Sequence, residues 1–250
     1  MRYENVAQVL LDKGADITQV GTYGSALQAA SFQGYENVAQ VLLDKGADAN
    51  IQGGIFGNAL TAASACGRKK ICQILLDKGA DVNAHGGHFG NALTAASCHG
   101  HEKIVQVLLD KGANANIQGG IFGNALTAAS HRGHEKIVQM LLDKGADVNA
   151  QSKKHGNALK AAKSSWKPNE KVVQILLQYM TDISAEKAAK RSASQAEIGS
   201  GNEDVVAKKP KAADAGSPST HVGAEEESAN AGRGDENKDR TWASVVLCQD

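Results

Sequence analysis

The sequence of 250 residues lacks long apolar runs. No stretch approaches the roughly 18–20 apolar residues that a membrane-spanning helix needs. The first residues, Met1–Asp12, also lack the apolar segment of a secretory signal peptide. We therefore expect a soluble protein of the cytosol. The short basic cluster Lys208–Lys211 leaves entry into the nucleus open.

Several other features are scarce. Lys plus Arg and Asp plus Glu number 27 each, so the formal net charge is zero and there is no basic excess for binding nucleic acids or membrane surfaces. The four cysteines form no Cys-x-x-Cys pair, which predicts reduced thiols in an intracellular protein. Aromatic residues make up 4% of a chain that is 42% hydrophobic, which predicts a core of Leu, Ile, Val and Ala.

What the sequence does contain is an internal repeat. The tetrapeptide Gly-Asn/Ser-Ala-Leu recurs every 33 residues, at Gly24, Gly57, Gly90, Gly123 and Gly156. A second motif, Leu-Leu-Asp-Lys-Gly-Ala, begins at Leu10, Leu42, Leu75, Leu108 and Leu141. A fixed period of this size is typical of stacked units, none of which buries its apolar face alone.

Each copy predicts two short helices joined by a turn. In the third copy, the side chain of Asn91 can cap the first helix, which should end near Gly100. The second helix should run from about His101 to Lys111, because its apolar residues have helical spacing. Gly112 can then take the left-handed conformation that ends a helix. An extended turn leads into the next copy.

These features resemble the ankyrin repeat over about residues 1–187: helix, turn, helix, the motif Gly-Ala-Asp-Val-Asn-Ala and the 33-residue period. The resemblance implies an all-α solenoid with β-turn fingers, no catalysis, no cofactor, and protein binding along the concave side formed by the fingers and first helices. The usual Thr-Pro-Leu-His is altered, which leaves open the hydrogen bonding between repeats made by its His. That position holds Gln28, Thr61, Thr94, Thr127 and Lys160.

The repeats suggest a division of the chain into four parts. We predict an N-terminal half repeat at 1–20, four full repeats at 21–152, a divergent capping repeat at 153–193 and a disordered tail at 194–250. The half repeat lacks its first helix, so Val6, Val9 and Leu10 should expose apolar surface, as in a fragment of a longer array. The last helix is expected to continue through 185–193. The tail is rich in small and charged residues, and its apolar end, 241–250, is either a docking segment or an ordinary chain end.

Catalytic, metal and nucleotide sites are not expected. Cys98, His99 and His101 lie at one turn between helices, but nothing supplies an orienting base or an oxyanion site. His85 and His88 lie in a loop about 15 Å from Cys98, too far for zinc ligands at about 2 Å. The loop glycines lack the pattern of a phosphate-binding loop.

The positions that differ between copies carry the most information about binding, because residues shared by all copies can simply have been duplicated. Ile51–Ser64 is identical to Ile117–Ser130, yet different residues follow the two segments. We name the two residues at the end of each first helix its variable pair. These pairs and some loop residues are our candidate protein-binding residues: Phe32, Gln33, Ala65, Cys66, His88, Cys98, His99, His131, Arg132, Lys154 and Trp166.

Two groups of residues have an alternative interpretation. The loop aromatics can bind a partner or can pack against the next loop, which we favour for Tyr23, Phe56, Phe89 and Phe122. The lysines of the last copy can form a solvated cap or can dock an acidic segment such as Glu225–Glu227; they are Lys153, Lys154, Lys160, Lys163, Lys167 and Lys171.

We therefore predict a monomeric, non-catalytic adaptor or scaffold that binds a protein partner. The alternative rests on the Tyr/Phe-Gly-Asn-Ala-Leu form of the motif, which is similar to ankyrin arrays of filamentous fungi. There such arrays often form the recognition arm of large signalling NTPases, so this chain could be a part of one.

Overall fold

The computed structural model describes residues 2–21, 24–165 and 168–199. The predictions for Tyr23, Trp166 and Lys167 lie outside these ranges, as do those for the tail beyond residue 199. The chain divides into a compact unit at residues 1–189 and a second unit at 190–250, of which only the end of the last helix is described.

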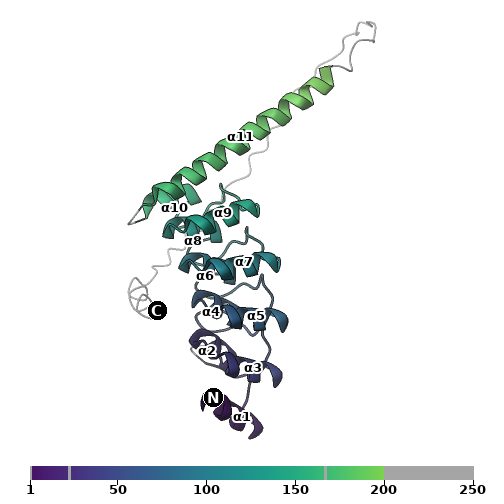
Figure 1. Ribbon diagram of the computed structural model, residues 1–250, viewed down its shortest axis with the longest axis vertical. Coiled ribbons are helices and arrows are strands. Elements are labelled where there is room, and N and C mark those ends of the chain that lie inside the picture. The colour runs from purple at the N-terminus through teal and green to yellow at the C-terminus, as the bar shows by residue number, and fades with distance from the viewer. Residues whose placement is uncertain (1, 22–23, 166–167, 200–250) are drawn as a thin grey trace, which may run out of the picture. The chain divides into compact units, whose positions relative to one another are not determined.

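The described helices alternate between first and second helices of the repeats, as predicted (Figure 1). The first helices are α2 (Ala26–Gln33), α4 (Ala59–Ala65), α6 (Ala92–His99), α8 (Ala125–Arg132) and α10 (Ala158–Ser164). The second helices are α1 (Arg2–Asp12), α3 (Glu36–Asp44), α5 (Lys69–Asp77), α7 (Glu102–Asp110), α9 (Glu135–Asp143) and α11 (Glu170–Gly199). No helix in the described residues is both long and apolar enough to cross a membrane.

The helix boundaries follow from the predicted caps. The Asn91 side chain accepts a hydrogen bond from the backbone N–H of Thr94 at 2.8 Å, which satisfies one of the free donors at the start of α6. Gly100 ends the helix in the left-handed conformation, at φ 78°. The same cap is made by Ser25, Asn58, Asn124 and Asn157.

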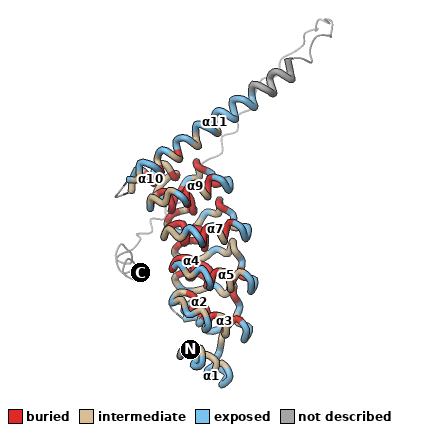
Figure 2. The backbone as a smooth tube through the Cα atoms, in the orientation of Figure 1, coloured by how far each residue is buried: buried red, intermediate tan, exposed pale blue. Residues whose placement is uncertain are grey.

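Within residues 1–189 the helices form two rows. The first helices contact one another in order from α2 to α10, and α2, α4, α6 and α8 each contact the second helix of their own copy. The first helices are made of small residues, so they approach closely, and every residue of α4 is buried (Figure 2). We call the first helices with their loops the first-helix side and the second helices the second-helix side.

The apolar core lies between the two rows. Leu75, Leu108 and Leu141 occupy the same position in successive second helices and are fully buried. Burial of one such side chain stabilises the fold by about 1.5–3 kcal/mol. Repetition of this contact from copy to copy explains why the units stack.

Ion pairs join the second helices on the solvent side. Lys78 Nζ lies 2.8 Å from Asp44 Oδ1, and Lys111 Nζ lies 3.1 Å from Asp77 Oδ1. Their side chains are about half exposed, and pairs of this kind contribute little to stability. The remaining ones in the described residues are Lys45–Asp12, Lys70–Glu36, Lys136–Glu102, Lys144–Asp110 and Lys171–Glu135.

The two ends of the stack also agree with expectation. Val6, Val9 and Leu10 in α1 are 54%, 57% and 55% exposed, which confirms the predicted apolar face. At the other end, Val172 and Leu176 of α11 are fully buried. This helix continues to Gly199, six residues beyond the predicted boundary of the capping repeat at 193.

Candidate protein-binding surface

The loops between copies form the predicted fingers. The first is a two-stranded antiparallel pair, β1 (Val20–Gly21) with β2 (Gly24–Ser25). Each later finger closes through one antiparallel bridge: Gly53 with Gly57, Gly86 with Gly90, Gly119 with Gly123, and Ser152 with Gly156. The finger of each copy therefore starts and ends at a defined place beside its first helix.

Successive fingers are fixed to one another by their backbones. The N–H of His88 donates to the carbonyl of Ile55 at 2.9 Å, and the N–H of Ile121 donates to the carbonyl of His88 at 3.1 Å. The approach is so close that a Cβ on Gly90 would overlap the backbone of Gly119. The spacing of the fingers is thus set by main-chain contacts.

The finger aromatics pack inward, as favoured above. Phe56, Phe89 and Phe122 are only 7%, 1% and 4% exposed. The rings of Phe56 and Phe89 are stacked with their centroids 6.4 Å apart, and Phe56 also contacts Phe32 at 5.2 Å. These three side chains therefore support the fingers and offer little surface to a partner.

Three of the candidate binding residues need correction. Ala65, Cys66 and Cys98 are 1%, 6% and 2% exposed. These three side chains are enclosed in the stack, although other first helices end with an exposed residue. They belong to the core and cannot form a partner-facing surface.

The other described candidates reach solvent to different degrees. Gln33, Arg132 and Lys154 are exposed. Phe32, His88, His99 and His131 are half-buried.

Rings and cations meet around Phe122. The His155 ring stacks on Phe122 at 5.3 Å, and the His131 ring lies 4.6 Å from that of His155. The Arg132 guanidinium lies 5.9 Å from the centre of the Phe122 ring, within reach of a cation–π interaction. The candidates His131 and Arg132 are therefore brought to one place, and the charge of Lys154 lies near enough to lower the pKa of His131.

Sequence reasoning missed a set of side chains that hold the variable pairs. Arg68, His101, His134 and Asn169 lie just before a second helix, and each reaches back to the end of the preceding copy's first helix; we call them clamp residues. The Nε2 of His101 lies 3.0 Å from the carbonyl oxygen of Ala65, and that of His134 lies 3.2 Å from the carbonyl of Cys98. The sequence did contain a signal for them, because Arg68, His101 and His134 each directly follow the glycine after a first helix.

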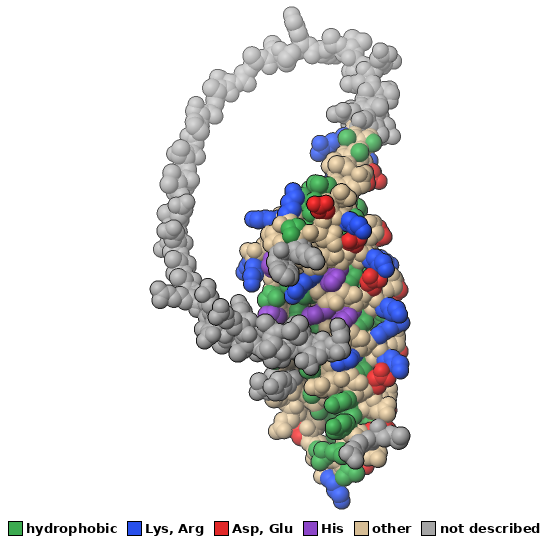
Figure 3. Space-filling model, turned by 60° about the vertical axis from the view of Figure 1, so that its left-hand side comes forward, with side chains coloured by type: hydrophobic (Ala, Val, Ile, Leu, Met, Phe, Trp, Pro, Cys, Tyr) green, Lys and Arg blue, Asp and Glu red, His purple; other side chains and the backbone are tan. Residues whose placement is uncertain are grey.

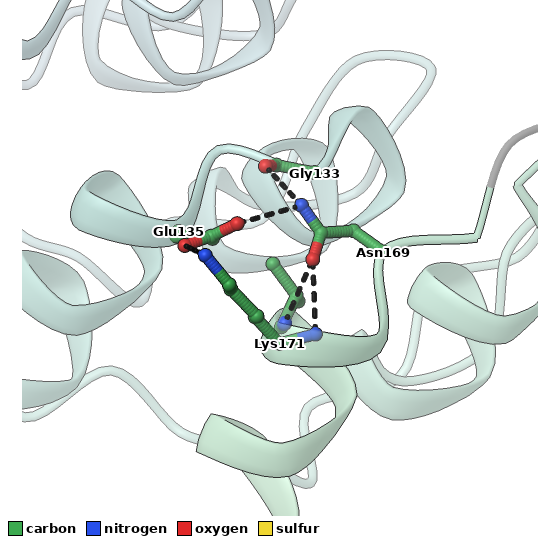
Figure 4. A network of polar contacts seen from close by, with 5 residues as sticks. Gly133, Glu135, Asn169 and Lys171 are labelled. Atoms are coloured by element: carbon green, nitrogen blue, oxygen red, sulfur yellow. Dashed lines mark hydrogen bonds and ion pairs between the residues drawn. The ribbon is translucent and has the colours of Figure 1, made fainter.

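Asn169 makes the most contacts of the clamp residues (Figure 4). Its Nδ2 donates to the carbonyl of Gly133 at 3.1 Å and to Oε1 of Glu135 at 3.0 Å. Its Oδ1 accepts from the backbone N–H groups of Lys171 and Val172 at the start of α11. One side chain thus joins the last copy to the fourth and caps a helix.

The position of the usual His of the motif behaves differently in different copies. Gln28 is buried, and its Nε2 donates to the carbonyls of Ile51, Gly53 and Gly57 in the next finger, at 2.9–3.2 Å. Thr61, Thr94 and Thr127 are also buried, but their hydroxyls have no hydrogen-bond partner. Hydrogen bonding between repeats at this position is therefore present with Gln and absent with Thr.

The electrostatics of these groups do not suit nucleophilic chemistry. Burial raises the pKa of the Cys98 thiol, and it raises the pKa of Cys72 to about 11. Burial also lowers the pKa of His99, whose Nδ1 lies 3.0 Å from the carbonyl of Ala95 in its own helix. A buried thiol that resists ionisation is a poor nucleophile. Among the described residues, no three His, Cys, Asp or Glu side chains are placed to hold a metal ion.

The fold and the fingers define a class of protein built from stacked helix–turn–helix units. The chain belongs to the ankyrin-repeat family: the model for ankyrin repeats in three copies matches residues 27–119 and also residues 96–187. No curated protein matches the chain. Ankyrin repeats are generally protein–protein interaction modules and are typically non-catalytic.

Proposed function

We propose that this protein is a non-catalytic adaptor that binds a protein partner along its fingers and the ends of its first helices. One observation carries the proposal. The identical segments Ile51–Ser64 and Ile117–Ser130 fold into the same finger and helix, yet their variable pairs differ in exposure. Ala65 and Cys66 are buried after the first segment, whereas Arg132 is exposed after the second.

The clamp residues support this proposal. Arg68, His101 and His134 contact carbonyls of the variable pairs, and Asn169 contacts the carbonyl of Gly133, which follows one. The exposed side chains of these pairs therefore stand on a held backbone. A preorganised surface loses less conformational freedom on binding, which favours affinity. A single chain is sufficient for such a surface, so we propose that the protein acts as a monomer, in the cytosol or the nucleus.

Site-specific photo-crosslinking in a cell lysate tests the proposal. A crosslinking residue placed at Gln33 or Arg132 should form adducts with the same partner. At Lys103, which is exposed on the second-helix side, it should not. Adducts obtained only from Lys103 would place the interaction on the wrong side and contradict the proposal.

A second candidate follows from the form of the motif, which is similar to ankyrin arrays of fungal signalling NTPases. In that case the array would be the recognition arm of a larger enzyme. The surface would bind its partner in the same way in both cases. The two candidates differ in whether the gene also encodes an enzymatic domain. An open reading frame for an NTP-binding domain, continuous with this sequence in the genome, would support the second candidate.

A further inference from the structure

Acidic residues are segregated in this molecule. Within residues 1–187, each Asp and Glu lies in a second helix or in the turn that follows one. The stretches 82–101, 111–134 and 148–169, which include the later fingers and first helices, contain no Asp or Glu. An anion that approaches this side therefore meets no carboxylate on it.

Basic residues enter the same side progressively along the chain. The finger and first helix at 17–34 have no Lys, Arg or His, and those at 49–66 have none either. The third copy adds histidines, the fourth adds His131 and Arg132, and the last adds His155 and several lysines. Figure 3 shows the histidines gathered on one face with basic side chains among them, while most of the acidic side chains lie along one edge, where Lys and Arg alternate with them.

The basic groups meet at one place on this side. We define the basic corner as Phe122, His131, Arg132, Lys153, Lys154 and His155; the ring and cation contacts given above connect four of these residues. Lys153 and Lys154 also line a cleft of about 610 Å³ between two fingers.

Among the described residues, the cations of the basic corner make no ion pair. The ion pairs in the described part of the chain join second helices and the residues that directly follow them, and Arg132, Lys153 and Lys154 take part in none. Burial lowers the pKa of His131, and the nearby charges of Arg132 and Lys154 lower it further. Lys153 and Lys154 line a cleft whose described residues include no Asp or Glu, whereas Arg132 also lines a cleft with Glu135 and Glu170. The least compensated positive charge of the corner therefore lies at its two finger lysines.

Other lysines of the last copy have a simpler explanation. Lys160 and Lys163 occupy the positions of Thr127 and Ser130, which the next copy covers in the fourth repeat. Lysine at these positions keeps the end of the stack solvated. Arg132 can also stabilise the end of α8 through the helix dipole, but Lys153 and Lys154 lie in a finger, where this explanation does not apply.

We propose that the basic corner binds a carboxylate-rich, extended segment of a protein partner. This inference rests on the proposed function and names the chemistry of the partner. Unpaired cations beside a ring favour carboxylates that bring apolar neighbours with them. A nucleic acid is a poorer fit, because it needs an extended basic stripe, whereas Lys and Arg on the first-helix side occur only in its last two copies.

The test measures binding of the full chain to a fluorescent peptide of alternating Glu and Leu, at low salt. The triple variant Arg132→Ala/Lys153→Ala/Lys154→Ala should weaken binding at least about tenfold, as expected when several charge-assisted contacts are lost. The matched control Lys13→Ala/Lys69→Ala/Lys103→Ala removes three exposed charges from the second-helix side and should change affinity less than about twofold. Circular dichroism should give the same melting curve for both variants.

Several results would overturn the inference. One is absence of peptide binding, and another is equal weakening by the two triple variants, which would indicate attraction to net charge alone. Tighter binding of a single-stranded DNA oligonucleotide at the corner would assign the site to nucleic acid instead. A rise in peptide affinity on changing Glu225, Glu226 and Glu227 to Gln would show that the chain's own tail is the occupant. If the peptide fails but crosslinks from Gln33 and Arg132 persist, the proposed function stands and only the acidic partner is lost.

Discussion

The first-helix side and the second-helix side connect the same repeats by different physical means. On the first-helix side, backbones nearly touch, rings stack and the buried side chain of Gln28 donates to carbonyls of the next copy. On the second-helix side, half-exposed Lys and Asp side chains of successive copies form ion pairs at the protein surface. Contacts of the first kind depend on shape and tolerate little change, whereas exposed ion pairs exchange readily with water.

The comparison also explains where recognition can develop. The second-helix side is charged, and its Lys–Asp pair recurs from copy to copy, from Lys45–Asp12 to Lys144–Asp110. The first-helix side is nearly uncharged until its variable pairs and last finger. A few substitutions there change the surface strongly without altering the core.

Gly90→Ala should give the largest effect, because it attacks the close approach of two fingers. At φ +85° a Cβ is strained, and it would also overlap the backbone of Gly119. We expect a loss of at least about 3 kcal/mol in the free energy of unfolding, measured in urea. The control is Gly112→Ala, at φ +86° with nothing within 4 Å, which should lose only about 1–2 kcal/mol. Equal losses of unfolding free energy in the two variants would show that only the backbone strain at positive φ matters and that the fingers can move apart.

Gln28→Thr should give the next largest effect. It changes the first copy to the residue found at Thr61 and removes three hydrogen bonds to the next finger. We expect a loss of about 2 kcal/mol, because the freed carbonyls stay largely buried. Gln33→Thr, at an exposed site of the same helix, should be neutral. An unchanged urea midpoint for Gln28→Thr would mean that water replaces the lost bonds.

Acid should destabilise the two sides in different pH ranges. Burial lowers the pKa of His99 and His134 below the ordinary value of 6.5. As the pH falls, these histidines therefore take up protons in the unfolded chain at a higher pH than in the folded chain. Stability is then full above about pH 6.5 and falls as the pH drops below it. Hydrogen bonds, first from Lys78 and then from Gln40, lower the pKa of Asp44 from 3.8, so its contribution persists above that value and is lost only in stronger acid.

Urea unfolding at pH 7.5, 5.5 and 3 would resolve these two ranges. His134→Asn, which copies the clamp residue Asn169, should reduce the first fall and leave the second. If stability were constant down to pH 4, the assignment of the first range to buried histidines would be wrong.

Lys111→Met should give the smallest effect. It removes the ion pair with Asp77, whose partners are each about half exposed. We expect no measurable shift in melting temperature, in low salt or in 1 M NaCl. A clear drop in melting temperature at low salt that disappears in 1 M NaCl would show that the ion pairs of the second-helix side contribute measurably to stability.

Much of the fold was predictable because it depends on local sequence. Asn91 and Gly100 set the limits of α6 by capping and by left-handed conformation, which the sequence already indicates. The candidate surface was harder to predict. The exposure of Cys66 and Cys98 depends on how far the next copy covers the end of a helix, and no local pattern encodes this.

The sequence by itself determined the repeat, its helices, its caps and the segregation of its charges. Only the tertiary structure decided which residues of each copy meet solvent. Residues 3–16 and 35–48 are identical, yet Leu10 is 55% exposed and the equivalent Leu42 is 3% exposed. The physical reason is that α3 packs against the first helix α2 of its own copy, whereas α1 has no first helix beside it in the described structure.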